Sequence, residues 1–490
     1  METSFYQQAA QAELEKIRST PLTPRARMAI PVQDMPCQDP EVRRHNMHEV
    51  AAGYTREQAI LEAERCLQCK NAPCIAGCPV KIDIPGFIRK MKGGDFEGAG
   101  QVIKQTNLLP SICGRVCPQE KQCQLPCTVG KALGGVDKAV QIGRLERFVA
   151  DYEREHGLQT VPHAGPASGR RVAIVGAGPA GLTCAADVRR EGHDVVVFEA
   201  FHKAGGVMVY GIPEFRLPKA LVASEAGLLE SMGVQFEMNF LVGRTRKLSS
   251  LLREDGFDAV FIGTGAGLPK FMDIPGENLV GVFSANEYLT RANLMKAYEI
   301  GRAGTPIYPS RRVAVLGGGN VAMDSARMAM RLGAEEVRVL YRRTREEMPA
   351  RAEEVEHAME EGIIFDFLAS PTKVVGDDKG KVAGLEVLSY QLGEPDESGR
   401  RKPVPIRGSE HFVPFDTVIV AIGNESNPLI SRTTPDLHVD RYGHIIVDEK
   451  QKTNLDRVYA GGDIVLGAAT VILAMGEGRR AAAAINEVLQ

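Results

Sequence analysis

Tryptophan is absent from the 490 residues, and aromatic residues make up only 6% of the chain. Proteins that stack on bases need exposed aromatic rings, and the net charge of −3 supplies no positive field for a polyanion. Both features disfavour a nucleic acid as partner. No apolar run approaches the roughly 18 residues of a membrane helix, and the opening stretch METSFYQQAAQAELEKIR lacks the apolar core of a signal peptide. We therefore expect a cytoplasmic protein with no membrane span.

Cysteine is scarce outside one segment. Eight of the ten cysteines lie between Cys66 and Cys127, and only Cys37 and Cys184 lie elsewhere. A disulfide scaffold is disfavoured because the chain is long and shows no export signal. Clustered cysteines in a cytoplasmic protein more often bind metal. Cys184 is expected to pack inside a helix, and Cys37 has no cysteine neighbour in the sequence.

The spacing of the eight cysteines favours iron–sulfur clusters. The two runs are Cys66-x2-Cys69-x4-Cys74-x3-Cys78-Pro79 and Cys113-x3-Cys117-x5-Cys123-x3-Cys127. In ferredoxins with two clusters, the last cysteine of a C-x2-C-x2-C-x3-C-P run ligates the other cluster. By this logic Cys66, Cys69 and Cys74 hold one cluster and Cys78 a second, although the middle gap of four departs from the ferredoxin run. We predict two [4Fe–4S] clusters, with structural zinc and redox-active disulfides as the alternatives.

A glycine-rich turn follows the predicted strand VAIV and opens a predicted helix. Its glycines permit a tight turn and a close approach to a pyrophosphate, which the helix N-terminus can bind. We therefore predict a dinucleotide site at Gly176, Gly178, Pro179, Ala180 and Gly181, with Glu199 at the end of the next strand as the partner of a ribose hydroxyl. A similar turn that binds no ligand is the alternative.

The same strand, turn, helix and strand pattern returns in RRVAVLGGGNVAMDSARMAMRLGAEEVRVLYRR. Its turn offers Gly317, Gly319, Asn320 and Val321 as nucleotide contacts. No carboxylate follows its second strand, which ends instead in Arg342 and Arg343. Arginine can pair with a 2′-phosphate, whereas an acid would repel it, so this unit is expected to prefer NADP(H) over NAD(H). The alternative is that both arginines face solvent.

The segment AGGDIV, with Gly462 and Asp463, resembles a flavoprotein motif in which the aspartate meets the ribityl and pyrophosphate region of FAD. The motif assigns FAD to the first turn and NADPH to the second. The alternative is that Asp463 is only the N-cap of a helix. Disulfide reductases that share this plan need a redox cysteine pair beside the flavin. No cysteine follows Cys184, which disfavours thiol–disulfide chemistry.

These patterns predict an α/β protein with three domains, in line with its length. We expect a helical domain with two [4Fe–4S] clusters (residues 1–155), an FAD-binding Rossmann-like domain (residues 169–300 plus 412–490) and an NADPH-binding domain inserted in it (residues 301–411). Thr55 and Gln58 form a candidate capping box that opens a helix, and AVQIGRLERFVADYERE reads as another. The Gly- and Pro-containing stretch HGLQTVPHAGPASG reads as a linker, and the Ala-rich end of the chain as a buried helix.

The motifs CGRVCPQE, LERFVAD, VGAGPAGL, GGVMVYGIPEFRLPK, GTGAG, GGGNVAMD, YRRTREEMPA, GSEH and AGGDIV occur together and in order. As a set they resemble one family. It contains the small (β) subunit of NADPH-dependent glutamate synthase, the large flavin subunit of NADH-dependent ferredoxin:NADP oxidoreductase, the related sulfide dehydrogenase, and the N-terminal part of dihydropyrimidine dehydrogenase. The segment from GTGAG to NLMKAY is more similar to the ferredoxin:NADP oxidoreductase type.

The resemblance implies a ligand set that spacing alone does not give. One cluster would take Cys66, Cys69, Cys74 and Cys127, and the other Cys78, Cys117, Cys123 and the carboxylate of Glu146. Cys113 would then be a bystander, although the sequence leaves open which of Cys113 and Glu146 is the eighth ligand. The resemblance also implies that the flavin lies along residues 205–213 and 468–471, which brings Gly205, Gly206, Gly211 and Thr470 to the site. Gly265, in the GTGAG motif, is a further predicted cofactor contact.

The implied activity is hydride transfer between NADPH and FAD, followed by single-electron transfer to the clusters. No general acid or base is needed, so none is assigned. The implied partner is a redox subunit: a small flavin and [2Fe–2S] subunit or the large subunit of glutamate synthase, with ferredoxin as a further candidate. A self-sufficient NADPH diaphorase and a redox sensor with structural clusters are the alternatives. Electron bifurcation, the direction of flow and the oligomeric state stay open.

Overall fold

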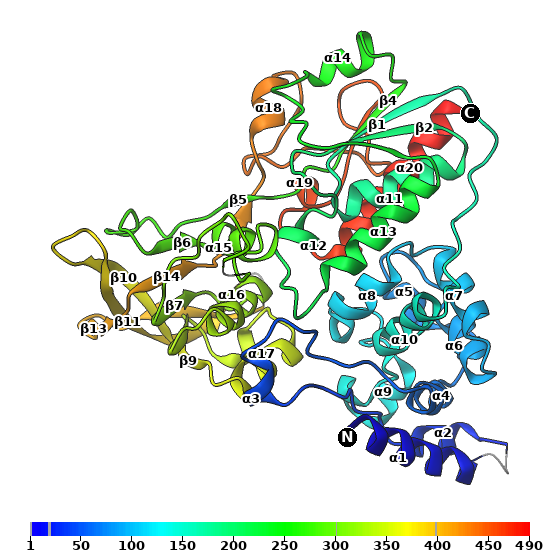
Figure 1. Ribbon diagram of the computed structural model, residues 1–490, viewed down its shortest axis with the longest axis horizontal. Coiled ribbons are helices and arrows are strands. Elements are labelled where there is room, and N and C mark those ends of the chain that lie inside the picture. Colours follow the sequence, from blue (N-terminus) through cyan, green and yellow to red (C-terminus); the bar gives the residue numbers. More distant parts are fainter. Residues whose placement is uncertain (1, 18–20, 300, 397–398) are drawn as a thin grey trace.

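Two parallel five-stranded sheets carry the two glycine-rich turns. The computed structural model describes residues 2–17, 21–299, 301–396 and 399–490. A helical region lies beside the first sheet unit, and the second sheet unit lies on the other side of the molecule (Figure 1). Residues 1, 18–20, 300 and 397–398, which fall within the predicted domains, lie outside the described residues.

The first sheet has the strand order β16–β4–β1–β2–β3. Its strands are β1 (Arg171–Val175), β2 (Asp194–Phe198), β3 (Gln235–Glu237), β4 (Ala259–Ile262) and β16 (Val458–Ala460). Its helices are α11 (Pro179–Arg190), α12 (Val207–Tyr210), α13 (Lys219–Ser231), α14 (Leu248–Arg253), α18 (Leu429–Thr433), α19 (Asp463–Leu466) and α20 (Val471–Leu489). The last strand and α20 return from the far end of the chain, which confirms the predicted insertion of one unit in the other.

The strand β1 is a continuous apolar run because helices cover both faces of the first sheet. Val172, Ala173 and Ile174 are fully buried, as expected for an interior parallel strand. Proline at the first position of α11 fits a helix start, where no backbone donor is lost. The Ala- and Gly-rich α20 packs tightly on α11, because a Cβ added to Gly478 would lie 2.3 Å from the carbonyl oxygen of Ala180.

The second sheet has the order β6–β14–β7–β8–β9. Its strands are β6 (Val282–Ser284), β7 (Arg312–Leu316), β8 (Glu336–Tyr341), β9 (Ile364–Phe367) and β14 (Thr417–Val420), and its helices are α15 (Ala285–Asn293), α16 (Asn320–Arg331) and α17 (Ala352–Glu360). The pairing extends this unit beyond the predicted residues 301–411, because β14 pairs with β7 and β6 pairs with β14, and neither joins the first sheet. The sequence did not show that β6 and β14 belong to the second sheet, because both are short apolar runs like the strands of the first unit.

An antiparallel sheet and a short strand pair complete the second half. The antiparallel strands are β10 (Ala369–Gly376), β11 (Val382–Pro395), β12 (Arg401–Pro405) and β13 (His411–Pro414). β5 (Leu268–Pro269) and β15 (Asn424–Glu425) pair where the chain crosses between the two units.

The N-terminal region is helical, as predicted. Its helices are α1 (Glu2–Ile17), α2 (Pro24–Ala29), α3 (Pro40–Arg43), α4 (Arg56–Glu64), α5 (Pro73–Ala76), α6 (Ile84–Lys92), α7 (Phe96–Lys104), α8 (Pro110–Val116), α9 (Thr128–Leu133) and α10 (Ile142–Glu155). Short 3₁₀ turns cover Gln119–Lys121 and Val136–Lys138. The capping box is confirmed: Thr55 Oγ1 accepts from the Gln58 backbone at 3.2 Å, and Gln58 Oε1 accepts from the Thr55 backbone at 3.1 Å. Residues 156–170, which contain the predicted linker, form no helix or strand.

Buried ion pairs join the N-terminal region to the second sheet unit, and the second unit to the first. Arg43 Nε lies 3.0 Å from Glu361 Oε1, and Arg327 of α16 lies 2.7 Å from the same carboxylate. Arg216, in the first unit, lies 2.7 Å from Asp324 of α16. Breaking one partner of such a pair typically costs about 3–5 kcal/mol, so these contacts fix the relative positions of the three regions. No helix in the described ranges is both long and apolar enough to span a membrane.

Candidate functional site

The first glycine turn lies directly above a buried carboxylate. Gly176 has a φ of +103°, a conformation that favours glycine. Glu199 Oε2 accepts from the backbone of Ala177 at 2.8 Å, and its Oε1 accepts from Phe201 at 2.9 Å. Burial raises the pKa of Glu199. A Cβ added to Gly178, at the start of α11, would meet no atom within 4 Å, which leaves space for a ligand against the helix N-terminus.

The other residues expected at the flavin gather around this turn. Gly205 donates to Ala177 O at 2.8 Å, and a Cβ added to Gly206 would lie 2.9 Å from Gly178 Cα. A Cβ added to Gly462 would lie 2.9 Å from the Ala180 side chain. These contacts place distant parts of the chain on one side of the first turn.

Acidic and aromatic groups also belong to the predicted flavin site. Burial and the charges of Asp463 and Glu199 raise the pKa of Tyr210 to about 12. Burial raises the pKa of Asp463 to about 6. Gly462 is the N-cap of α19 and Asp463 its first residue, so the aspartate is not the cap itself.

Three further residues belong to the predicted flavin site. Thr470 is the N-cap of α20, with its hydroxyl accepting from Leu473 at 3.4 Å. The carbonyl of Gly211 accepts from Asn293 at 3.2 Å. A Cβ added to Gly265 would meet no atom within 4 Å. The residues thus fit a flavin dinucleotide, and their individual contacts with it stay a prediction.

The second turn repeats the first in the inserted unit. Gly317 has a φ of +138°, and a Cβ added to Gly319 would meet nothing closer than Pro349 at 3.9 Å. Asn320 begins α16, and its side-chain oxygen accepts from the backbone of Arg351 at 2.9 Å. Val321 is 37% exposed beside it. This open helix start fits a nucleotide phosphate.

The two arginines after β8 have different surroundings. Arg342 is exposed and forms no hydrogen bond or ion pair with any described residue. Arg343 is only 6% exposed, and its Nη2 lies 2.5 Å from Asp396 Oδ2. Its Nε donates to the Arg401 carbonyl at 2.8 Å. Arg342 is therefore the freer of the two for a 2′-phosphate.

Four cysteines from both runs surround one small cavity. Cys66, Cys69, Cys74 and Cys127 line it together with apolar residues such as Ile84. Burial and the neighbouring Cys66 and Cys127 raise the pKa of Cys74 to about 12. A free thiolate is unfavourable there, whereas positive iron would stabilise it. The structure thus brings together the four residues assigned to one cluster.

The second set lies deeper. Burial and the neighbouring Cys117, Cys78 and Glu146 raise the pKa of Cys123 well above its usual range. Burial raises the pKa of Glu146 to about 8, against the opposing hydrogen bond from Asn107 Nδ2 at 2.6 Å. Their charges act on one another, and three thiols with a carboxyl have the donor chemistry that an iron–sulfur cluster requires. Their ligation of one cluster stays a prediction.

Cys113 borders this second set. Its Sγ lies 3.7 Å from Asn107 Oδ1 and 3.6 Å from Met475 Sδ of α20. It is 1% exposed. Cys113 lies beside the second set, so its predicted role as a bystander rather than a cluster ligand stays a prediction.

All ten cysteines are free thiols. Cys184 is fully buried in α11, as expected, and Cys37 lies 3.9 Å from His357. Within the described ranges, no three His, Cys, Asp or Glu side chains converge on a position for a single metal ion.

The deeper cysteine set adjoins the last helix of the first sheet unit. A Cβ added to Gly476 of α20 would lie 3.2 Å from the carbonyl of Pro79, which follows Cys78. Gln122 Nε2, next to Cys123, donates to Thr470 Oγ1 at 3.4 Å. Sequence reasoning found both ends of this contact but not the contact itself, because it depends on how the regions pack.

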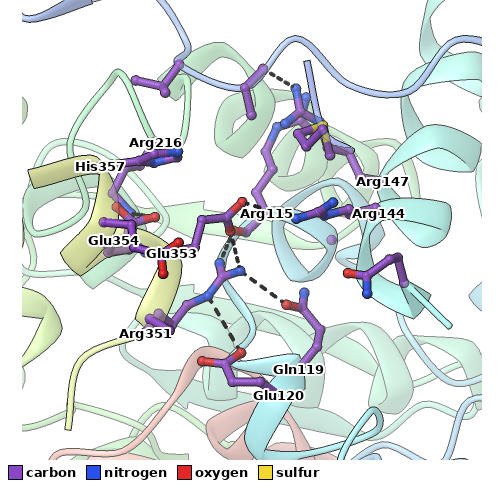
Figure 2. A pocket seen from close by; sticks show the side chains of 18 of the residues that line it. Arg115, Gln119, Glu120, Arg144, Arg147, Arg216, Arg351, Glu353, Glu354 and His357 are labelled. Atoms are coloured by element: carbon purple, nitrogen blue, oxygen red, sulfur yellow. Dashed lines mark hydrogen bonds and ion pairs between the residues drawn. The ribbon is translucent and has the colours of Figure 1, made fainter. Parts of the chain in front are cut away.

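A second cavity, of about 390 Å³, lies between the helical region and the inserted unit (Figure 2). Charged side chains from both line it, among them Arg115, Arg144, Arg351 and Glu353. No motif in the sequence pointed to this cavity, since its walls come from several elements far apart in the chain.

Comparison with known families agrees with this division. The family described as dihydropyrimidine dehydrogenase domain II, 4Fe-4S cluster, matches residues 43–158, and pyridine nucleotide-disulphide oxidoreductase matches residues 170–486. FprA from Mycobacterium tuberculosis, solved in complex with NADPH, covers 65% of this chain and 84% of its own at 20% identity, with a TM-score of 0.54. That likeness shows the fold alone.

Two curated relatives extend over most of this chain. The small chain of NADPH glutamate synthase from Halomonas elongata is 38% identical over 469 residues, which cover 93% of this chain and 97% of that protein. The beta subunit of NADP(+)-dependent formate dehydrogenase from Moorella thermoacetica is 40% identical over 444 residues. This chain spans only 60% of that subunit.

The paired glycine turns, the cysteine-lined cavity and these matches agree on an oxidoreductase that binds FAD and NADP and carries a 4Fe–4S domain. The chain belongs to the pyridine nucleotide-disulphide oxidoreductase family, in the group that contains the small chains of glutamate synthase.

Proposed function

We propose that this chain is the electron-transfer subunit of a multisubunit oxidoreductase and moves electrons between NADP(H), FAD, two [4Fe–4S] clusters and a partner redox subunit. When bound, FAD exchanges a hydride with NADP(H) and single electrons with iron–sulfur clusters. The observation that carries the proposal is the contact between Thr470, at the flavin site, and Gln122, beside Cys123. It joins the predicted flavin site to the deeper cysteine set.

The residues of each site have separate tasks. The turn at Gly176–Gly181 and the carboxyls of Glu199 and Asp463 would bind and orient FAD. The turn at Gly317–Val321 would hold the NADPH phosphates, with Arg342 reading the 2′-phosphate. Apolar walls at the outer cysteine set exclude water from the thiolates, and that set would pass electrons onward because Cys69 is less buried than Cys78.

Two members of the family fit this role. We favour the ferredoxin:NADP oxidoreductase type, with or without electron bifurcation, because the segment between GTGAG and NLMKAY is more similar to that type. The alternative is the NADPH-oxidising small subunit of glutamate synthase, favoured by the near-complete coverage of such a chain at 38% identity. The relatives named as subunits support a partner in either case.

Replacing Arg342 tests the NADPH preference. Arg342→Ala should raise the KM for NADPH at least about tenfold, because a charged hydrogen bond is worth about 1.5–3 kcal/mol, and should leave the KM for NADH nearly unchanged. Arg343→Ala should act more weakly on NADPH, since Arg343 already pairs with Asp396. Arg345→Ala is the matched control. Equal effects of Arg342→Ala on both nucleotides would rule out its 2′-phosphate role.

Replacing Glu146 and Cys113 in turn tests which of the two is a ligand of the deeper cluster. Glu146→Ala should change one of the EPR signals of the anaerobically reduced protein, because it removes a ligand. Cys113→Ala removes an adjacent thiol of similar burial and should leave both signals intact. A changed signal in Cys113→Ala with an unchanged one in Glu146→Ala would reverse the assignment.

Anaerobic isolation of this chain from its native source tests the proposed function as a whole. We expect FAD, two clusters and a second redox subunit to co-elute. A small flavin and [2Fe–2S] subunit would identify the ferredoxin-linked type, and a large glutaminase-bearing subunit the glutamate synthase type. Elution of the chain alone, with physiological turnover, would overturn the subunit role in favour of a self-sufficient reductase.

A further inference from the structure

We propose that Arg351 couples nucleotide binding at the second glycine turn to the reduction potential of the cluster at Cys117. It would act as a positioning residue, since it touches the turn and the cysteine loop rather than a reacting atom. The proposal rests on the proposed function, because it requires both the nucleotide and the cluster.

The loop before α17 is bonded to the nucleotide turn. Ala350 donates its backbone N–H to Gly318 O at 3.3 Å, and Arg351 donates its own to Asn320 Oδ1 at 2.9 Å. The ring of Pro349 is the nearest group to the open side of Gly319, at 3.9 Å from a Cβ placed there. A phosphate at this helix start would therefore border the loop directly.

The same loop is bonded to the segment that carries Cys117. Arg351 Nη1 donates to the carbonyl of Arg115 at 2.8 Å, and its Nη2 donates to Gln119 Oε1 at 3.4 Å. Lys121 Nζ donates to the carbonyl of Pro349 at 2.9 Å. Arg115, Gln119 and Lys121 flank Cys117 on both sides, so one short loop connects the two sites.

The guanidinium of Arg351 is buried but incompletely bonded. Its side chain is 10% exposed, and its Nη2 lies 2.7 Å from Glu353 Oε2. Its Nε forms no hydrogen bond and lies 3.9 Å from Glu120 Oε2 (Figure 2). The cavity of about 390 Å³ borders this group and gives it room to shift. A cation that can shift in a poorly solvated place is well suited to change a nearby potential.

Charge gives the direction of the effect. A positive group near a cluster favours the reduced state, which is the more negative one, and so raises the midpoint potential. Phosphate groups at the turn would draw the loop and its guanidinium toward themselves. We expect bound nucleotide to lower the potential of the cluster at Cys117, and the cluster's reduction to weaken nucleotide binding by the same factor.

The test is an EPR-monitored redox titration of the anaerobic holoprotein with and without adenosine 2′,5′-bisphosphate. This fragment carries the 2′-phosphate and one phosphate of the pyrophosphate but no nicotinamide, so it cannot accept a hydride. The signal that Glu146→Ala changes identifies the relevant cluster. In the wild type we expect a shift of about fivefold in the reduction equilibrium, the lower end of known couplings. For a one-electron couple this is about 40 mV toward lower potential.

Three variants distinguish the outcomes. Arg351→Gln should lower the potential without ligand and abolish the shift, while Arg351→Lys should keep most of the charge effect but lose the shift, because it lacks the two-pronged contact with Arg115 and Gln119. Arg311→Gln, which removes an exposed charge of the same unit, should behave like the wild type. An undiminished shift in both Arg351 variants with intact iron and FAD content would overturn the coupling alone. Absence of clusters from the wild type would overturn the proposed function with it.

Discussion

Charge buried at the junction of three regions is the constraint on which the other features depend. Arg43, Arg327 and Glu361 have side chains no more than 2% exposed and share one ionic network, which reaches Arg216 of the first sheet unit through Glu354. An unpaired charge at such depth is costly, so the regions cannot separate without a penalty of several kcal/mol. The two glycine turns and the cysteine loops are therefore held at fixed separations.

Fixed separations explain how one chain can serve three kinds of cofactor. The predicted flavin site and the deeper cysteine set share the helix α20, through Thr470 at its start and Gly476 within it. The nucleotide turn of the inserted unit reaches the same cysteine set from the other side through Arg351. The cysteine set at Cys117 is thus the meeting point of both sheet units, and the outer set lies toward solvent.

Local patterns in the sequence predicted the parts more completely than their assembly. Glycine turns and cysteine runs depend on short-range geometry, so the sites around Gly176 and Gly317 and the cavity at Cys66 follow from spacing and resemblance. The sequence analysis assigned the strands β6 and β14 to the wrong sheet, because the composition of a short apolar strand does not show which strand it pairs with. The ion pair of Arg343 with Asp396 joins residues far apart in the chain, and no motif records it.

The order of electron transfer tests the central claim most directly. The anaerobic protein would be mixed with NADPH and followed by rapid-scan absorbance together with freeze-quench EPR. The account predicts that the flavin absorbance bleaches first and that the signals of reduced clusters follow, with FAD and about eight irons per chain for two [4Fe–4S] clusters. A bleached flavin with clusters that stay oxidised, or a protein that contains no iron–sulfur cluster, would contradict it.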